Sequence, residues 1–152
     1  MVDNRCYPSR MIERRTFITL AGCAAAVQVH PVPALALGER ERHFIAEAAR
    51  MQSQAVAAGD QAYGAVVVRA GAIVGYGPSR VILDRNPDAH AERVALWDAQ
   101  RRLGTKDLAG AVMYSTSRPC VACEHALALA NLERMYFGPT GTDAGQPKRH
   151  GS

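Results

Sequence analysis

Two short motifs stand in a fixed order along this chain and govern its interpretation. The first is His90-Ala91-Glu92, and the second is Pro119-Cys120-Val121-Ala122-Cys123. Each motif comes where the pattern of apolar residues predicts the start of a helix. The backbone N–H groups in the first turn of a helix have no intrahelical partners, so side chains from two such starts can meet in a polar site that favours negative charge.

The side chains in these motifs are of the kinds that bind zinc. Zn²⁺ prefers thiolate and neutral imidazole ligands in a tetrahedral shell, and a catalytic zinc ion keeps one of its four positions open for water. His90, Cys120 and Cys123 would supply three ligands, so the motifs predict one zinc ion per chain. The C-x-x-C spacing at a helix start lets both sulfurs reach one ion, and the helix dipole favours their thiolate form.

A carboxylate accompanies the predicted ligands. Glu92 follows His90 by two residues, so its side chain points to a different part of the same pocket. There it can move protons without binding the metal. We therefore predict that Glu92 is the catalytic acid and base of a zinc-dependent reaction.

Two other interpretations of the cysteines stay open. A C-x-x-C pair that opens a helix after a strand is also the arrangement of thiol–disulfide redox sites. That interpretation leaves His90 and Glu92 without a role. The other is a non-catalytic zinc-binding module, although structural zinc sites normally have four protein ligands and three are visible here.

The spacing of apolar residues predicts an α/β fold. Helical periodicity and short β-branched runs alternate along the chain. The expected helices cover residues 39–58, 89–103 and 121–132, and the expected strands cover 63–68, 72–76, 111–116 and 133–137. This order predicts three layers, α/β/α, around a mixed sheet of four to five strands, with the last two strands parallel. Residues 140–152 show no period, and we expect them to form a flexible tail.

Around the two motifs the chain resembles the zinc-dependent cytidine and deoxycytidylate deaminase superfamily, whose signature combines H-x-E with P-C-x-x-C. The resemblance extends roughly from Tyr63 to Gly138 and implies a cytidine deaminase-like zinc-binding domain at residues 37–139. Histidine as the first ligand makes the chain similar to the branch that contains guanine, deoxycytidylate and tRNA adenosine deaminases.

The resemblance also implies a reaction and a set of substrate contacts. The reaction is hydrolytic deamination of a free nucleobase, nucleoside or similar amino-heterocycle. In it a zinc-bound hydroxide attacks the carbon that bears the exocyclic amine, and Glu92 shuttles protons. Tyr63, Gly64 and Ala65 would line the pocket, and Ser79 stands where many members have a substrate-binding asparagine.

The chain departs from the family pattern at two positions near the second motif and also at its C-terminal end. Arg118 stands where a glutamate often precedes Pro-Cys, and Ala122 stands where a methionine is common. Members usually add a fifth strand and one or more helices, which residues 140–152 do not predict. The fourth strand would then be an exposed sheet edge. Such edges pair with other chains, so we expect a homodimer or a larger homo-oligomer. The alternative is that the domain is a trimmed relative with impaired activity.

Residues 1–36 have the order of a bacterial export signal. Arg14 and Arg15 precede an uncharged, alanine-rich stretch that ends near the small residues Ala34-Leu35-Ala36. The paired arginines followed by Thr-Phe-Ile resemble a twin-arginine signal, which implies a periplasmic location. A lipoprotein box at Cys23 is the alternative, but the apolar stretch before it is short. Prolines interrupt the segment, so we expect no stable membrane span.

The charge of the remaining chain argues against a nucleic-acid partner. The full chain has a net charge of +4, but residues 1–36 hold four arginines and two acidic residues. The remainder has 14 basic and 12 acidic residues, scattered without a run. Nucleic-acid binding relies on a concentrated positive surface. We therefore expect a small-molecule amino-heterocycle as substrate and no nucleic-acid partner.

Overall fold

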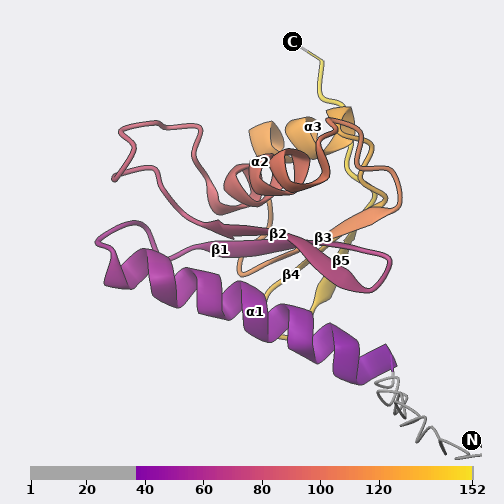
Figure 1. The fold of residues 1–152 in the computed structure, drawn as a ribbon, viewed down its shortest axis with the longest axis horizontal. Helices are drawn as coiled ribbons and strands as arrows, with labels where there is room; N and C mark the ends of the chain where they lie inside the picture. Colours follow the sequence, from indigo (N-terminus) through magenta and orange to yellow (C-terminus); the bar gives the residue numbers. More distant parts are fainter. Residues whose placement is uncertain (1–36, 152) are drawn as a thin grey trace, which may run out of the picture. The chain divides into compact units, whose positions relative to one another are not determined.

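The structure, a computed structural model, describes residues 37–151. The export signal predicted at residues 1–36, with Cys23, lies outside them. The helices are α1 (Leu37–Ala57), α2 (Ala91–Leu103) and α3 (Val121–Leu129). The strands are β1 (Gly64–Arg69), β2 (Ala72–Pro78), β3 (Ala111–Ser115), β4 (Arg134–Phe137) and β5 (Thr142–Gly145). Figure 1 shows the sheet between α1 on one side and α2 and α3 on the other, which confirms the predicted α/β/α fold.

The five strands form one mixed sheet in the order β2-β1-β3-β4-β5. β1 pairs antiparallel with both β2 and β3, β4 pairs parallel with β3, and β5 pairs antiparallel with β4. A parallel pair requires a crossover connection, which α3 supplies between β3 and β4. The predicted parallel pairing of the third and fourth strands is therefore confirmed.

Large side chains pack α1 against one face of the sheet. The buried cluster on this face contains Phe44, Ala48, Met51, Val66, Val68 and Tyr114. Successive strand residues point to opposite faces, so Val66 and Val68 join this cluster while Ala65 and Val67 join the cluster on the other face.

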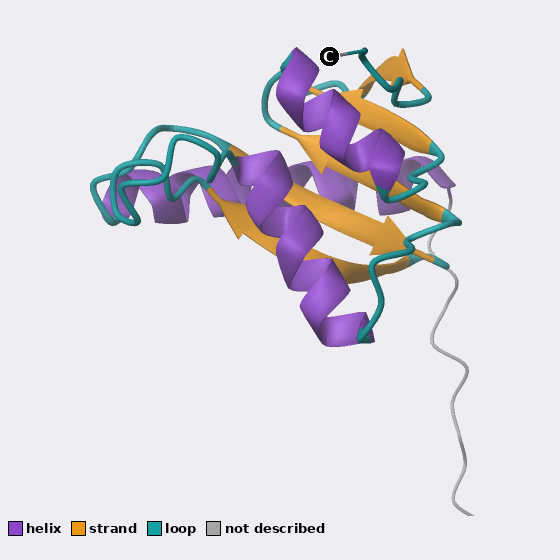
Figure 2. Ribbon diagram, turned by 90° about the horizontal axis from the view of Figure 1, so that it is seen from above, coloured by secondary structure: helices purple, strands orange, loops and turns teal. Residues whose placement is uncertain are grey.

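Small residues let α2 approach the opposite face closely. Figure 2 shows α2 and α3 lying over the strands. A Cβ atom on Gly77 of β2 would overlap the carbonyl oxygen of Ala91 and the backbone nitrogen of Ala95. Gly75 meets the next turn of α2 in the same way. Because Gly75 and Gly77 have no side chains, the first turns of α2 can lie this close to β2.

The C-terminal segment differs from the sequence prediction. Residues 142–145 form β5, where we expected a flexible tail without regular structure. Gly138 and Gly141 adopt positive φ values and turn the chain back onto β4. The strand has no apolar period because it is held by backbone pairing with β4 and by an ion pair of 2.7 Å between Arg134 and Asp143.

The edge of the sheet is affected by this difference. β4 is paired on both sides, by β3 and β5. The prediction that the fourth strand forms an exposed edge is therefore wrong, and so is the argument for self-association that we based on it. The homo-oligomer itself stays a prediction. Within residues 37–151, no helix is long and apolar enough to cross a membrane.

Candidate metal centre and active site

His90 is held at the start of α2 by a well-tied loop. It is the N-cap residue, with extended φ and ψ of −61° and 152°. The loop that leads to it is anchored by the buried carboxylate of Asp60, which accepts hydrogen bonds from the backbone N–H groups of Ile82 and Leu83 and from the Ser79 hydroxyl. The backbone N–H of Arg80 donates to the carbonyl of Ala89, next to His90. These contacts place the imidazole before α2 begins.

The two cysteines occupy the start of α3. Cys120 is the N-cap, and its sulfur accepts a hydrogen bond of 3.4 Å from the backbone N–H of Cys123. Cys120 is exposed, whereas Cys123 is fully buried. Both cysteines have reduced, unpaired thiols in this structure. One helical turn therefore presents two sulfurs on the side that faces α2.

The predicted ligands meet at one point. Nδ1 of His90 lies 3.6 Å from Sγ of Cys120 and 3.5 Å from Sγ of Cys123. Their ligand atoms all lie within 4.8 Å of one another. Tetrahedral zinc, with Zn–S and Zn–N bonds of about 2.3 and 2.0–2.1 Å, places sulfur and nitrogen ligands roughly 3.6 Å apart. The donor set and its spacing thus fit a zinc ion.

Glu92 lies beside this cluster in the first turn of α2. Its side chain is buried, and one carboxylate oxygen is 3.7 Å from Sγ of Cys123. Burial raises the pKa of Glu92, although its own backbone N–H, the charge of His90 and the Cys123 thiol act in the opposite direction. A carboxyl group with a raised pKa can hold a proton nearer neutrality than an exposed glutamate.

The surroundings of the Cys123 thiol favour its protonated form, which a metal ion would have to displace. Burial raises the pKa of Cys123, and the neighbouring Glu92 carboxylate raises it further. Without a metal the thiol is therefore protonated at neutral pH. A bound divalent cation reverses this preference because coordination stabilises the thiolate.

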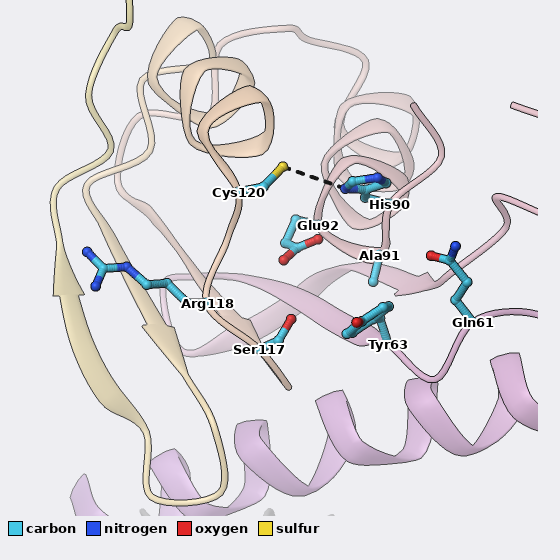
Figure 3. A pocket seen from close by; sticks show the side chains of 8 residues that line it. All are labelled: Gln61, Tyr63, His90, Ala91, Glu92, Ser117, Arg118 and Cys120. Atoms are coloured by element: carbon cyan, nitrogen blue, oxygen red, sulfur yellow. Dashed lines mark hydrogen bonds between the residues drawn. The ribbon is translucent and has the colours of Figure 1, made fainter. Parts of the chain in front are cut away.

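A cavity of about 370 Å³ opens beside the cluster, within the usual range for small-molecule sites. Figure 3 shows Glu92, His90 and Ser117 turned toward it, with Tyr63 on the opposite wall from Cys120. The lining residues are Gln61, Tyr63, His90, Ala91, Glu92, Ser117, Arg118 and Cys120. Tyr63, which we expected to contact substrate, is therefore at the cavity.

The other three predicted substrate contacts lie elsewhere. The Cα of Gly64 faces α1, where a Cβ atom would overlap the backbone of Ala48. Ala65 is fully buried in the cluster between the sheet and α2. Ser79 is 1% exposed, and its hydroxyl donates a 2.8 Å hydrogen bond to Asp60. None of these three residues is among those that line the cavity, so their contacts with substrate stay a prediction.

The sequence interpretation missed four residues that line the cavity. They are Gln61, Ala91, Ser117 and Arg118. Each stands within two residues of Tyr63 or of one of the two motifs, so proximity to the motifs was the available signal. Arg118 was noted as a departure from the family pattern, but nothing in the sequence indicated that it reaches the cavity.

Known proteins share these features. Residues 38–139 match the family described as the cytidine and deoxycytidylate deaminase zinc-binding region. The tRNA-specific adenosine deaminase of Aquifex aeolicus is 36% identical over 97 residues, which are 64% of this chain and 64% of that protein. The guanine deaminase of Bacillus subtilis is 32% identical over 104 residues, which are 68% of this chain and 67% of that protein.

The fold agrees with these sequence matches. The solved structure of guanine deaminase from Bacillus subtilis superimposes with a TM-score of 0.61 at 31% identity, over 63% of this chain and 62% of that one. The region matched in the Aquifex aeolicus deaminase covers 64% of that protein, which is less than two thirds of its length. The matched span contains His90, Glu92, Cys120 and Cys123. The chain belongs to the cytidine and deoxycytidylate deaminase zinc-binding family.

Proposed function

We propose that this protein is a zinc-dependent hydrolytic deaminase of a small amino-heterocycle, such as a free nucleobase or a nucleoside. The observation that carries the proposal is the buried carboxylate of Glu92 beside three convergent metal ligands, at the wall of a cavity. A structural zinc site has no need of such a carboxylate. The reaction exchanges an exocyclic amine for an oxygen from water and releases ammonia.

The side chains divide the chemistry among them. His90, Cys120 and Cys123 would hold the metal, and zinc in such a site acidifies a water molecule toward neutrality. Glu92 would take one proton from the attacking water and pass it to the ring nitrogen, and would then take the proton of the new hydroxyl group and pass it to the departing amine. Its burial and raised pKa suit it to this role. Tyr63 and Gln61, at the wall away from the cysteines, position the heterocycle.

We infer a small substrate rather than a tRNA. The relatives include both a guanine deaminase and tRNA-specific adenosine deaminases, so the family alone leaves both classes open. Residues 37–152 carry 14 basic and 12 acidic residues without a continuous positive run. Many of the arginines in the described part are neutralised by a neighbouring carboxylate. Binding to a polynucleotide backbone relies on the opposite arrangement.

The first experiment measures zinc per chain and ammonia release together. The purified protein should contain about one zinc ion, and His90→Ala should lose it or bind it much more weakly. Glu92→Gln should keep the zinc and lose ammonia release by at least about 100-fold, the lower end of what a positioned acid–base contributes. Screening covers purines, pyrimidines and pterins, with an unmodified tRNA as the competing substrate.

The contrary outcomes are equally clear. A metal-free protein with a Cys120–Cys123 disulfide would sink the deaminase interpretation and favour a redox site. Zinc that stays bound in an otherwise inert protein would favour a non-catalytic module. Rapid turnover of tRNA alone would replace the small substrate by a polynucleotide.

We also propose self-association, now on different grounds from the sequence argument. β5 is a short edge strand, and the outer faces of α2 and α3 expose Trp97, Val121 and Leu129 at 39%, 61% and 56%. Exposed sheet edges and exposed apolar side chains each favour association with another chain. Sedimentation of the zinc-loaded protein should give a mass above that of one chain, and a monomer would contradict the proposal.

A further inference from the structure

We propose that Arg118 makes this site select amino-heterocycles that carry an anionic substituent, a phosphate or a carboxylate, over their neutral counterparts. The proposal rests on the proposed deaminase function and adds the substrate class. It begins from a charged side chain that lines the cavity and that neither the metal centre nor the proton transfer uses.

The position of Arg118 is at the rim of the cavity. It directly precedes the Pro119-Cys120 start of the α3 segment, so the same short stretch supplies a metal ligand and a cation. Figure 3 draws Arg118 and Gln61 at opposite ends of the group of labelled side chains, with the Arg118 guanidinium directed outward, away from the other seven. A heterocycle whose amine faces the metal ligands would therefore reach the guanidinium only through a substituent that extends past the rim, remote from the reacting carbon.

Within residues 37–151 the guanidinium of Arg118 has no acidic partner. Several other arginines in this part of the chain form ion pairs, as Arg93 does with Asp88 and Arg134 with Asp143. No carboxylate within that span lies at ion-pair distance from Arg118. Its recorded contact is with the ring of Phe137, whose centroid is 6.0 Å from the guanidinium carbon. Stacking on a ring orients the planar fork and leaves its N–H edges available.

No other charged side chain in the lining of the cavity neutralises Arg118, so its positive charge is available to a ligand. Glu92 is the one carboxylate among the lining residues, and it is buried against Cys123. An arginine fork that is not neutralised by the protein binds phosphate or carboxylate through two parallel hydrogen bonds. A neutral base would use only a fraction of that capacity.

The test compares matched substrate pairs that differ only in the anion. One arm uses adenosine with AMP, guanosine with GMP and cytidine with CMP, and the other uses pterin with pterin-6-carboxylate. For zinc-loaded wild-type protein we expect kcat/KM of the anionic member to exceed that of the neutral member by about 10- to 100-fold, mainly through KM. The arm that shows the preference identifies phosphate or carboxylate.

Variants assign the preference to the side chain. Arg118→Ala should bring the ratio between the paired substrates close to one, while Arg118→Lys should keep part of it because the charge remains and the fork is lost. Arg101→Ala is the matched control, because it removes one positive charge at the far end of α2 on a side chain that is 74% exposed. That variant should keep the wild-type ratio.

A binding measurement separates this proposal from the proposed function. In a Glu92→Gln background the same pairs are titrated by calorimetry, and Arg118→Ala is added to that background. The proposal is supported when the anionic member binds about 10-fold or more tightly and Arg118→Ala abolishes the difference. It is overturned when the pairs bind equally, when the difference survives Arg118→Ala, or when a tRNA outcompetes every monophosphate. A protein that binds anionic members selectively but releases no ammonia would instead contradict the deaminase function.

Discussion

α1 and α2 pack on opposite faces of the sheet through different kinds of residue. The α1 face is filled by large side chains, including a row in which the ring of Phe44 lies 5.3 Å from that of Tyr114, which lies 4.9 Å from Tyr136. On the opposite face, alanines of α2 pack over Gly75 and Gly77, beside a second group of large side chains that includes Leu108, Met113, Leu127 and Leu132. The predicted metal ligands and Glu92 all come from the starts of α2 and α3.

This difference teaches how stability and site geometry are divided. Large apolar side chains contribute most to burial, so the stability of the packing of α1 on the sheet depends on them. Small residues contribute less but let backbones approach, and on the α2 face that approach places His90 and Glu92 opposite Cys123. The comparison therefore predicts that the two faces respond differently to substitution.

Phe44→Ala should have the largest effect on stability. Removing a buried aromatic side chain costs about 3–5 kcal/mol of the free energy of unfolding, and Phe44 is 7% exposed. Chemical denaturation of the zinc-loaded protein measures this loss. At a temperature where the variant is folded, zinc content and KM should match the wild type. A loss of zinc in the folded variant would break the comparison.

Gly77→Ala should cost less stability but damage the site. The new Cβ atom would overlap the backbone of α2, and such overpacking typically costs about 1–3 kcal/mol. Because α2 must move, zinc affinity and kcat should fall together, as measured by competition with a chelator and by ammonia release. Gly38→Ala is the control, since a Cβ atom there has nothing within 4 Å. Equal behaviour of the two variants would contradict the close-approach argument.

Asp60→Asn should give a stability loss that depends on pH. Burial raises the pKa of Asp60, but the hydrogen bonds from Leu83, Gln61, Ser79 and Ile82 outweigh it, so the pKa lies below its ordinary value. The carboxylate therefore stabilises the fold above the unfolded-state pKa of about 3.9. That contribution is lost as the pH falls through the lowered pKa.

Thermal unfolding between pH 7 and pH 2.5 measures this prediction. The difference in Tm between wild type and Asp60→Asn should be largest near neutral pH and should shrink in acid. Glu133→Gln, at an exposed position, serves as the control and should leave the profile unchanged. A difference that stays constant across the range would show that Asp60 acts through shape rather than charge.

Arg134→Ala should have the smallest effect. The ion pair between Arg134 and Asp143 is about half exposed on both sides, and exposed pairs contribute about 0.2–1 kcal/mol. Hydrogen exchange should increase in β5 and leave α1 and α2 unchanged. Exchange that increased across the whole sheet would show that β5 is coupled to the core more strongly than its contacts indicate.

The sequence interpretation was accurate where a feature depends on residues close together in the sequence, and it failed where the feature depends on residues far apart. The parallel pairing of β3 and β4 was predicted from the helix between them, which is a local rule. β5 was missed because Thr142-Asp143-Ala144-Gly145 has no apolar alternation, and its backbone partners belong to β4. We predicted a substrate contact for Ser79 from its position directly after β2. In the structure its hydroxyl donates to Asp60, which follows α1.

The sequence by itself determined the ligand set, the carboxylate beside it and the α/β/α fold. It could do so because ligand chemistry depends on residue type, and helix starts depend on neighbouring residues. Only the tertiary structure decided that Gln61, Ser117 and Arg118 share a cavity with His90, and that Arg118 has no acidic partner there. The physical reason is that a cavity is bounded by segments distant in sequence, whose meeting depends on how closely glycines 75 and 77 let α2 pack on the sheet.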